Sequence, residues 1–348
     1  SISGIYIIYL LFLALLDYIQ IYDTKVFSIW LSISLTLISH YIGFYYFGSR
    51  KGHENLLKQV YWASIIYIIY LFYIQFLTLN SELYYTYSGL FQLGAIRNKN
   101  LYVLSFFAVL LIYALINKKL TIKNTNFTKL IVVILIAVII ITFRRTAWAC
   151  LILGVFILLI KTNLKKALNI FLIISVAFAV IFYIFSGIIK SQLESRGNIS
   201  LEYAEYIDTD YRALEYIFIA KDISNKSLKW SLFGDKYGFH DRKFWWKHSE
   251  VDNSIHSDIV YMIYSTGLLG LLFYLLIYYK IFNNIRKRFY PSNTNKEIKE
   301  YKTLFYALLI MNLSILFSGG IYKIPINGII SFLFIGSLTG ILTSKFKH

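Results

Sequence analysis

Charged or titratable side chains occur at two places in this apolar chain where insertion into a membrane does not require them. Arg144 and Arg145 interrupt the run "IITFRRTAWACLILG", and His256 and Asp258 open the run "NSIHSDIVYMIYSTGLLGL". A charge at membrane depth costs at least about 2.5 kcal/mol and normally faces a protein interior or a wet cavity. These four residues are therefore the first candidates for chemistry.

The arginine pair needs negative charge close by. The apolar runs on either side, 130–143 and 146–160, contain no acidic residue. The partner is then a distant acid of the same chain, or a ligand. A diphosphate suits two arginines well, because the guanidinium fork matches phosphate oxygens in a bidentate way. The alternative is a turn in which both side chains reach up to the membrane interface.

His256 carries the second kind of chemistry. A histidine titrates near neutral pH, which suits a general base or a phosphate ligand. When a helix is projected from His256, one stripe contains Val260, Ile263, Gly267, Gly270 and Tyr274. Asp258 lies about 200° round that helix, where it offers an alternative base. The competing interpretation is a hydrogen-bonded interfacial histidine beside a capping Ser254.

The elements that position these residues are membrane helices. The 348-residue chain is 58% hydrophobic and only 15% charged, with a mean hydropathy of +0.60. These values predict an all-α polytopic membrane protein, a single integral membrane domain over 1–348. The ten predicted spans are 3–21, 26–47, 60–79, 101–116, 130–143, 146–160, 167–186, 255–279, 303–318 and 326–343.

Loop charge predicts the orientation of these spans. One alternate set of loops holds nineteen basic residues, whereas the short loops of the other set hold six. The positive-inside rule places the richer set, and both termini, in the cytoplasm. The segment 187–254 is then a large periplasmic loop. Fusing 130–143 with 146–160 into one broken span would put the basic loop 280–302 outside, so we predict two spans.

The outer segment 187–254 is nearly neutral and long enough to contain short helices. "DTDYRALEYIFIAKDIS" predicts one, with Asp208 or Asp210 as cap and with Tyr211, Leu214, Phe218 and Lys221 on one stripe. Arg212 falls off that stripe. Asp208 and Asp210 also form a D-x-D, which the cap explains equally well.

Trp245 and Trp246 follow a glycine-containing stretch of the same segment. They suit stacking on sugar rings, and they suit equally the role of interfacial anchors. No histidine has metal-ligand spacing with another ligand, and the single cysteine, Cys150, excludes a cysteine-based site. We therefore predict no metal site and no cofactor. The net charge of +17 lies in short loops, where topology explains it better than nucleic acid does.

The order of these motifs resembles the O-antigen polymerase and O-antigen ligase superfamily of bacterial membrane glycosyltransferases. The resemblance rests on "GAIRNKNLY", "TFRRTAW", "YRALEYIFIAKDIS", "LFGDKYGF" and "NSIHSDIVYMIYSTGLLGL". It implies a GT-C-like fold with one large periplasmic loop, in the bacterial inner membrane. It also implies a metal-independent transfer of a glycan from undecaprenyl diphosphate on the periplasmic face.

Residue roles follow from the same resemblance. Arg144 or Arg145 matches the family's membrane arginine, Arg212 its loop arginine, and His256 the histidine that opens the span after the large loop. Asn98-Lys99-Asn100 stands where the family often has Asn-Pro-Asn, and His256-Ser257 where it often has His-Asn. The three arginines would bind the diphosphate, while His256 or Asp258 would deprotonate the acceptor hydroxyl.

Three functions compete. We expect an O-antigen polymerase, because the Tyr-rich loops suit an enzyme that fits one repeat unit. A ligase, which moves the finished chain onto lipid A core, shares the fold and the donor. A flippase or other transporter is expected to show related halves or interrupted helices around mid-membrane charges. Expected partners are the lipid-linked donor and acceptor, membrane lipid and a possible chain-length regulator protein, but no nucleic acid.

Overall fold

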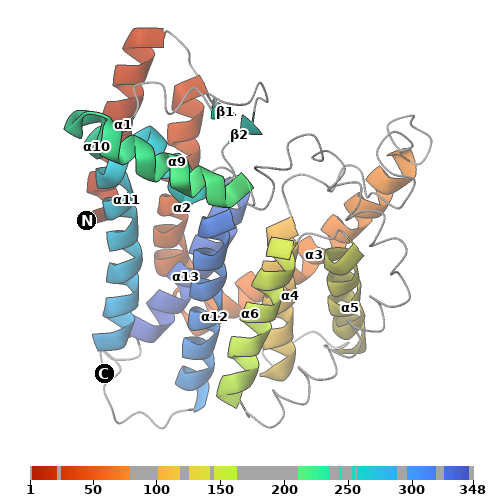
Figure 1. Ribbon diagram of the computed structural model, residues 1–348. Coiled ribbons are helices and arrows are strands. Elements are labelled where there is room, and N and C mark those ends of the chain that lie inside the picture. The colour runs from red at the N-terminus through yellow and green to blue at the C-terminus, as the bar shows by residue number, and fades with distance from the viewer. Residues whose placement is uncertain are drawn as a thin grey trace. The chain divides into compact units, whose positions relative to one another are not determined.

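The computed structural model describes residues 2–21, 25–78, 101–117, 125–141, 145–162, 211–234, 243–244, 253–254, 257–287, 296–318 and 325–344 of the chain. These residues are almost entirely helical (Figure 1). The helices are α1 (Ile2–Ile21), α2 (Lys25–Tyr46), α3 (Arg50–Thr78), α4 (Leu101–Ile116), α5 (Thr125–Ile141), α6 (Arg145–Thr162), α9 (Tyr211–Asn225), α10 (Leu228–Phe233), α11 (Asp258–Lys287), α12 (Lys296–Ser318) and α13 (Pro325–Ser344). Strands β1 (Lys243–Phe244) and β2 (Asn253–Ser254) pair antiparallel.

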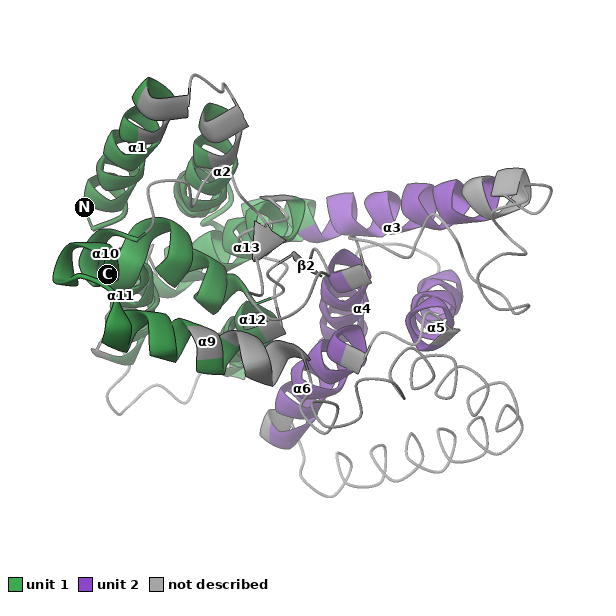
Figure 2. Ribbon diagram, turned by 45° about the horizontal axis from the view of Figure 1, so that its top comes forward, with its two compact units in different colours: residues 1–56, 211–348 green, residues 57–210 purple. Residues whose placement is uncertain are grey.

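The chain divides into two compact units, whose boundary falls inside α3 (Figure 2). Unit 1 comprises residues 1–56 and 211–348, and unit 2 comprises residues 57–210. Every predicted span coincides with a helix except 167–186, which lies outside the described residues.

Four of the described helices are long and apolar enough to cross a membrane. Their apolar parts are Arg50–Tyr73, Asp258–Arg286, Lys296–Phe317 and Ile326–Thr343. Shorter apolar stretches occur at Ile2–Leu16, Tyr102–Ile116, Thr125–Ile140 and Thr146–Ile160. Apolar side chains also stay exposed along α1, where Ile5, Ile8 and Phe12 lie on one side of the helix. Such a surface suits lipid.

Several helices begin before the predicted spans. The helix α3 starts at Arg50 instead of residue 60, and α12 starts at Lys296 instead of residue 303. Hydropathy detects only the apolar part of a helix, whereas a charged first turn can be stabilised by its own side chains. In α3, the Ser49 hydroxyl accepts from Gly52 N at 3.0 Å, and Arg50 pairs with Glu54 at 3.1 Å.

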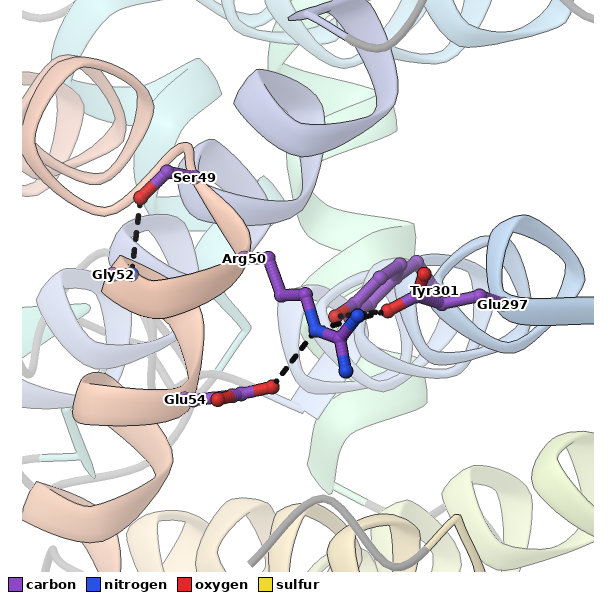
Figure 3. A network of polar contacts seen from close by, with 6 residues as sticks. All are labelled: Ser49, Arg50, Gly52, Glu54, Glu297 and Tyr301. Atoms are coloured by element: carbon purple, nitrogen blue, oxygen red, sulfur yellow. Dashed lines mark hydrogen bonds and ion pairs between the residues drawn. The ribbon is translucent and has the colours of Figure 1, made fainter.

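The same network joins two distant parts of unit 1. Arg50 Nε lies 3.4 Å from Glu297 Oε1 at the start of α12, and the Tyr301 hydroxyl donates to that carboxylate at 3.3 Å (Figure 3). One turn into α3, His53 Nδ1 lies 2.9 Å from Ser337 Oγ of α13. Since the Ser337 hydroxyl donates to the Phe47 carbonyl, His53 Nδ1 is the donor in this pair. The α2–α3 turn and the start of α12 therefore share one end of unit 1.

Glycines bring α2 and α13 into backbone contact. A Cβ on Gly43 would overlap the Leu333 carbonyl, and a Cβ on Gly336 would overlap the His40 carbonyl. Gly340 faces Gly48 in the same way. The contacting residue numbers rise together, so the two helices run parallel. Gly336 and Gly340 form the small-residue spacing by which membrane helices approach closely.

Helix directions within unit 1 alternate as the sequence predicts. The helix α1 runs antiparallel to α11, with Tyr6 beside Tyr274 and with the Tyr9 hydroxyl on the Thr266 carbonyl. The helix α12 runs antiparallel to α13, where Ser331 donates to Asn312 Oδ1 at 2.8 Å.

In unit 2, α5 and α6 are two separate antiparallel helices, as predicted. Trp148 Nε1 of α6 donates to the Ile139 carbonyl of α5 at 2.7 Å, which places the two helices side by side. The start of α6 also contacts the start of α4. Tyr102 Oη lies 2.9 Å from Thr146 Oγ1, and Ser105 donates to the Ala147 carbonyl.

Candidate active site

The helix α11 begins at Asp258, with Ser257 as its N-cap. Ser257 Oγ accepts from Val260 N at 3.4 Å, and its carbonyl accepts from Tyr261 N at 3.0 Å. The expected cap, Ser254, belongs instead to strand β2. The helix starts three residues later than expected, so His256 comes before its cap in the sequence. His256 itself lies outside the described residues.

Asp258 is completely buried. Its carboxylate therefore lies in the interior of unit 1. Helix α11 does not run straight from this residue.

The bend lies at Gly267, where the backbone is not helical and φ is +67°. The predicted stripe from His256 through Gly267 to Tyr274 is therefore wrong, because the helix does not continue straight through Gly267. The break frees backbone groups that need new partners. One of them is satisfied by α1, since the Tyr9 hydroxyl donates to the Thr266 carbonyl at 2.6 Å.

The end of α10 packs against this break. A Cβ on Gly267 would overlap the Leu232 carbonyl and Phe233 N. In return, a Cβ on Gly234 (φ +83°) would lie 2.8 Å from Gly267 N. Both glycines have a φ that favours glycine, and neither leaves room for a side chain. Helix α10 and the break in α11 are thus joined backbone to backbone.

Helix α9 lies across the same end of α11 and α12 (Figure 1). The Tyr216 hydroxyl lies 2.7 Å from Ser257 Oγ and donates to the Phe317 carbonyl at 3.3 Å. One side chain therefore connects α9 with the N-terminus of α11 and with the last turn of α12.

The packed face of α9 differs from the predicted one. Tyr216 is half-buried and Ile219 is buried, and the Ile223 carbonyl accepts from Ser231 of α10. Lys221, which belongs to the stripe named from the sequence, is exposed. The position of Arg212 is one turn before Tyr216 on the packed face. Arg212 is thus on this face, whereas the predicted stripe lies on the opposite one.

The predicted site residues fall into three groups. Asp258 is fully described, while Arg212 and Arg145 are described by their helix positions, at the beginnings of α9 and α6. Arg144, His256, Trp245 and Trp246 lie outside the described residues. Within unit 1, the structure brings Tyr216 of α9, four residues after Arg212, into contact with Ser257 at the start of α11. Within unit 2, Arg145 precedes Thr146 at the end where α4, α5 and α6 contact one another.

Sequence reasoning missed Tyr216. Tyrosine is common in this chain, with 31 residues, so its presence at this position carries no signal. The polar run before α11 was a signal for the cap, because Ser257 and Ser254 are both suited to that role. Among the described residues, no group of three or more His, Cys, Asp or Glu side chains is placed to hold a metal ion.

Comparisons with protein families, with curated proteins and with solved structures find no match for this chain.

Proposed function

We propose that the protein is an O-antigen polymerase, a glycosyltransferase that joins lipid-linked repeat units. The observation that carries this proposal is the contact between α9 and α11. It places the position of Arg212 one turn from Tyr216, whose hydroxyl meets Ser257 between His256 and Asp258. The helix that carries Arg212 thus contacts the helix that begins at Asp258, and His256 comes two residues before Asp258 in the sequence.

The proposed reaction moves a glycan from a polyprenyl diphosphate to an acceptor hydroxyl. The bond from the anomeric carbon to the diphosphate oxygen breaks, and a bond from that carbon to the acceptor oxygen forms. The hydroxyl proton passes to His256, and negative charge collects on the leaving diphosphate. Arg212 would stabilise that charge, since a fixed cation aimed at developing charge lowers the barrier.

Asp258 has a different position from the one expected of a base. Its carboxylate is buried. A base must come within hydrogen-bond reach of the proton that it removes. We therefore assign proton transfer to His256 first, and to Asp258 second. The sequence-based roles of Arg144 and Arg145 in diphosphate binding, and of Trp245 and Trp246 in glycan binding, stay predictions.

The proposed location is the bacterial inner membrane, with both termini cytoplasmic and the 187–254 segment periplasmic. The alternating directions of α1, α11, α12 and α13 support this topology. The α2–α3 turn and the start of α12 lie at the same end of unit 1, and each belongs to the set of loops that is rich in basic residues. Their shared location also supports this topology.

One observation favours the transporter as a second candidate. Interrupted helices beside buried charges are typical of carriers, and α11 is interrupted at Gly267 with Asp258 buried nearby. The ligase shares its chemistry with the polymerase, so the geometry of this site does not separate these two.

The polymerase, the ligase and the transporter can be distinguished by analysing the surface glycan and the lipid-linked pool of a strain that lacks this gene. Lipid A core capped by a single repeat would support the polymerase. Uncapped core with long polymer on undecaprenyl diphosphate would identify a ligase. Uncapped core with single repeats held on the cytoplasmic face would identify a carrier and remove the catalytic roles of His256 and the arginines.

A further inference from the structure

Helix α10 exposes apolar side chains although it belongs to a segment between two predicted spans. Leu228 is 75% exposed and Phe233 is 41% exposed. Both lie on one arc of the helix, about 140° wide, together with the exposed Lys229. Removing such apolar surface from water is favourable. The position of α10 along its neighbouring helices indicates what this arc contacts.

The end of α10 contacts α11 well inside the apolar run of that helix. A Cβ on Gly267 would overlap the Leu232 carbonyl and Phe233 N, and Gly267 comes nine residues after the first residue of α11. The adjacent Thr266 carbonyl accepts from the Tyr9 hydroxyl of α1 at 2.6 Å. The end of α10 therefore lies at the level that the Tyr9 side chain reaches.

The exposed apolar surface of α1 extends beyond that level in both directions. It includes Ile5, Ile8, Phe12 and Ile19. From Ile5 to Ile19 the helix rises about 21 Å, which fits inside a hydrocarbon core of about 30 Å. The rise from Tyr9 to Ile19 is about 15 Å, whereas α10 covers only about 7.5 Å. Even if α10 points straight toward the outer surface, it ends inside this apolar band.

Polar groups at both ends of α10 have partners, as contact with lipid requires. Ser227 Oγ accepts from Trp230 N at 3.3 Å, and the Ser227 carbonyl accepts from Ser231 N at 3.0 Å. At the other end, Gly234 N donates to the Trp230 carbonyl at 2.7 Å. The Ser231 hydroxyl donates to the Ile223 carbonyl of α9 at 3.1 Å. The backbone of α10 is therefore suited to an apolar environment.

Two lysines near α10 are compatible with this depth. Lys226 Nζ lies 3.3 Å from Asp222 Oδ2 and 4.2 Å from the centre of the Trp230 ring, so its charge is balanced locally. Lys229 is exposed on the same arc as Leu228. Its long stem can lie along apolar surface while the ammonium group reaches the headgroup phosphates.

We propose that α10 re-enters the outer leaflet of the membrane. Leu228 and Phe233 contact lipid acyl chains there, and Lys229 contacts headgroup phosphate. The 187–254 segment is thereby held to the bilayer at α10 and to α11 at Gly267. This inference requires that unit 1 spans a membrane, and it is independent of glycosyl transfer.

The test measures the environment of single spin labels on the full chain, reconstituted in bilayers of phosphatidylethanolamine and phosphatidylglycerol. The labels are placed at Leu228→Cys and Phe233→Cys in a Cys150→Ser background. Phe12→Cys on α1 provides a lipid-exposed reference, and Lys51→Cys on α3 provides an aqueous reference. Collisions are measured with oxygen, which concentrates among acyl chains, and with a nickel chelate, which stays in water.

We expect the labels at positions 228 and 233 to match the Phe12→Cys label. Their ratio of oxygen to nickel collisions should exceed that of the Lys51→Cys label. A ratio equal to that of Lys51→Cys would place α10 in water and overturn the proposal. Low access to both collision partners would mean that protein covers this arc, which would overturn it as well.

Two controls keep the outcomes distinct. Size-exclusion chromatography measures whether each labelled protein stays folded. If Phe233→Cys does not fold, position 228 decides alone, since Leu228 is mostly exposed and tolerates a label. A Phe12→Cys label that resembles Lys51→Cys would mean that α1 is not in the bilayer, and the membrane assignment of unit 1 would fail together with the proposal.

Discussion

Arg212 and Lys221 lie on opposite faces of α9, and this difference makes a matched pair of variants. Lys221 is exposed, while the Arg212 position shares the packed face with Tyr216 and Ile219. Arg212→Ala should lower the rate of glycan transfer about a hundredfold, because removing one charge-stabilising group from a transition state typically costs that much. Lys221→Ala should leave the rate unchanged.

The measurement is the rate at which lipid-linked polymer forms, at equal levels of folded protein in the membrane. Equal losses of rate in the two variants would mean that transfer depends on the total positive charge of α9. Arg212 would then have no specific role at the site.

His256 is expected to carry proton transfer. His256→Ala should lower transfer by at least about a hundredfold, since a positioned general base typically contributes that much. The amount of folded protein in the membrane should not change, which a detergent extraction followed by size-exclusion chromatography would measure. Loss of the folded protein instead would assign His256 a structural role at the start of α11.

The residue types of the site could be predicted from the sequence, but the helix faces on which these residues lie could not. His256 stands out as a titratable residue at the start of an apolar run, whereas Arg212 was indicated by the family resemblance. The stripe named from the sequence ends at Lys221, which is exposed, whereas the face that packs uses Tyr216, Ile219 and a backbone carbonyl. An apolar stripe alone does not identify the packed side, since apolar side chains also occur on exposed helix faces.

The break in α11 separates the part of the helix that begins at Asp258 from the rest. Gly267 adopts a φ of +67° and lies against the Leu232 carbonyl. Gly267→Ala should lower the stability of the folded protein by about 1–3 kcal/mol, because a side chain at a positive φ is strained and this one would also overlap backbone. Thermal unfolding in detergent, followed by intrinsic fluorescence, measures the change.

Leu275→Ala is a suitable control for this prediction, since Leu275 lies on the same helix with 43% of its surface exposed. Its substitution should cost less stability than Gly267→Ala. A Gly267→Ala protein as stable as the wild type would mean that α11 tolerates a straight course through this position.

The presence of the described membrane helices could be predicted from the sequence, whereas the break in α11 at Gly267 could not. Apolar length and loop charge correctly separated α5 from α6, because a single span there would have reversed every following loop. At Gly267 the sequence contains a glycine that suits a helix-packing face. Its actual conformation depends on α10, a segment more than thirty residues earlier, and no local pattern shows that contact.

The orientation of unit 1 can be tested with two exposed positions at its opposite ends. Lys51 follows Arg50 of the α3 network, and Asn225 ends α9. In a Cys150→Ser background, a membrane-impermeant maleimide added to spheroplasts should label Asn225→Cys. It should label Lys51→Cys only after the membrane is broken. Labelling in the reverse order would place 187–254 in the cytoplasm and contradict the charge-based topology.

The pairing of α2 with α13 has a consequence for biosynthesis. The second helix of the chain packs its glycines on the last one, and His53 finds Ser337 across 284 residues. At about 5–20 residues per second, α2 leaves the ribosome some tens of seconds before α13. During that time Gly43 and Gly48 face lipid or an insertion chaperone, so the fold of unit 1 closes only after the final helix has entered the membrane.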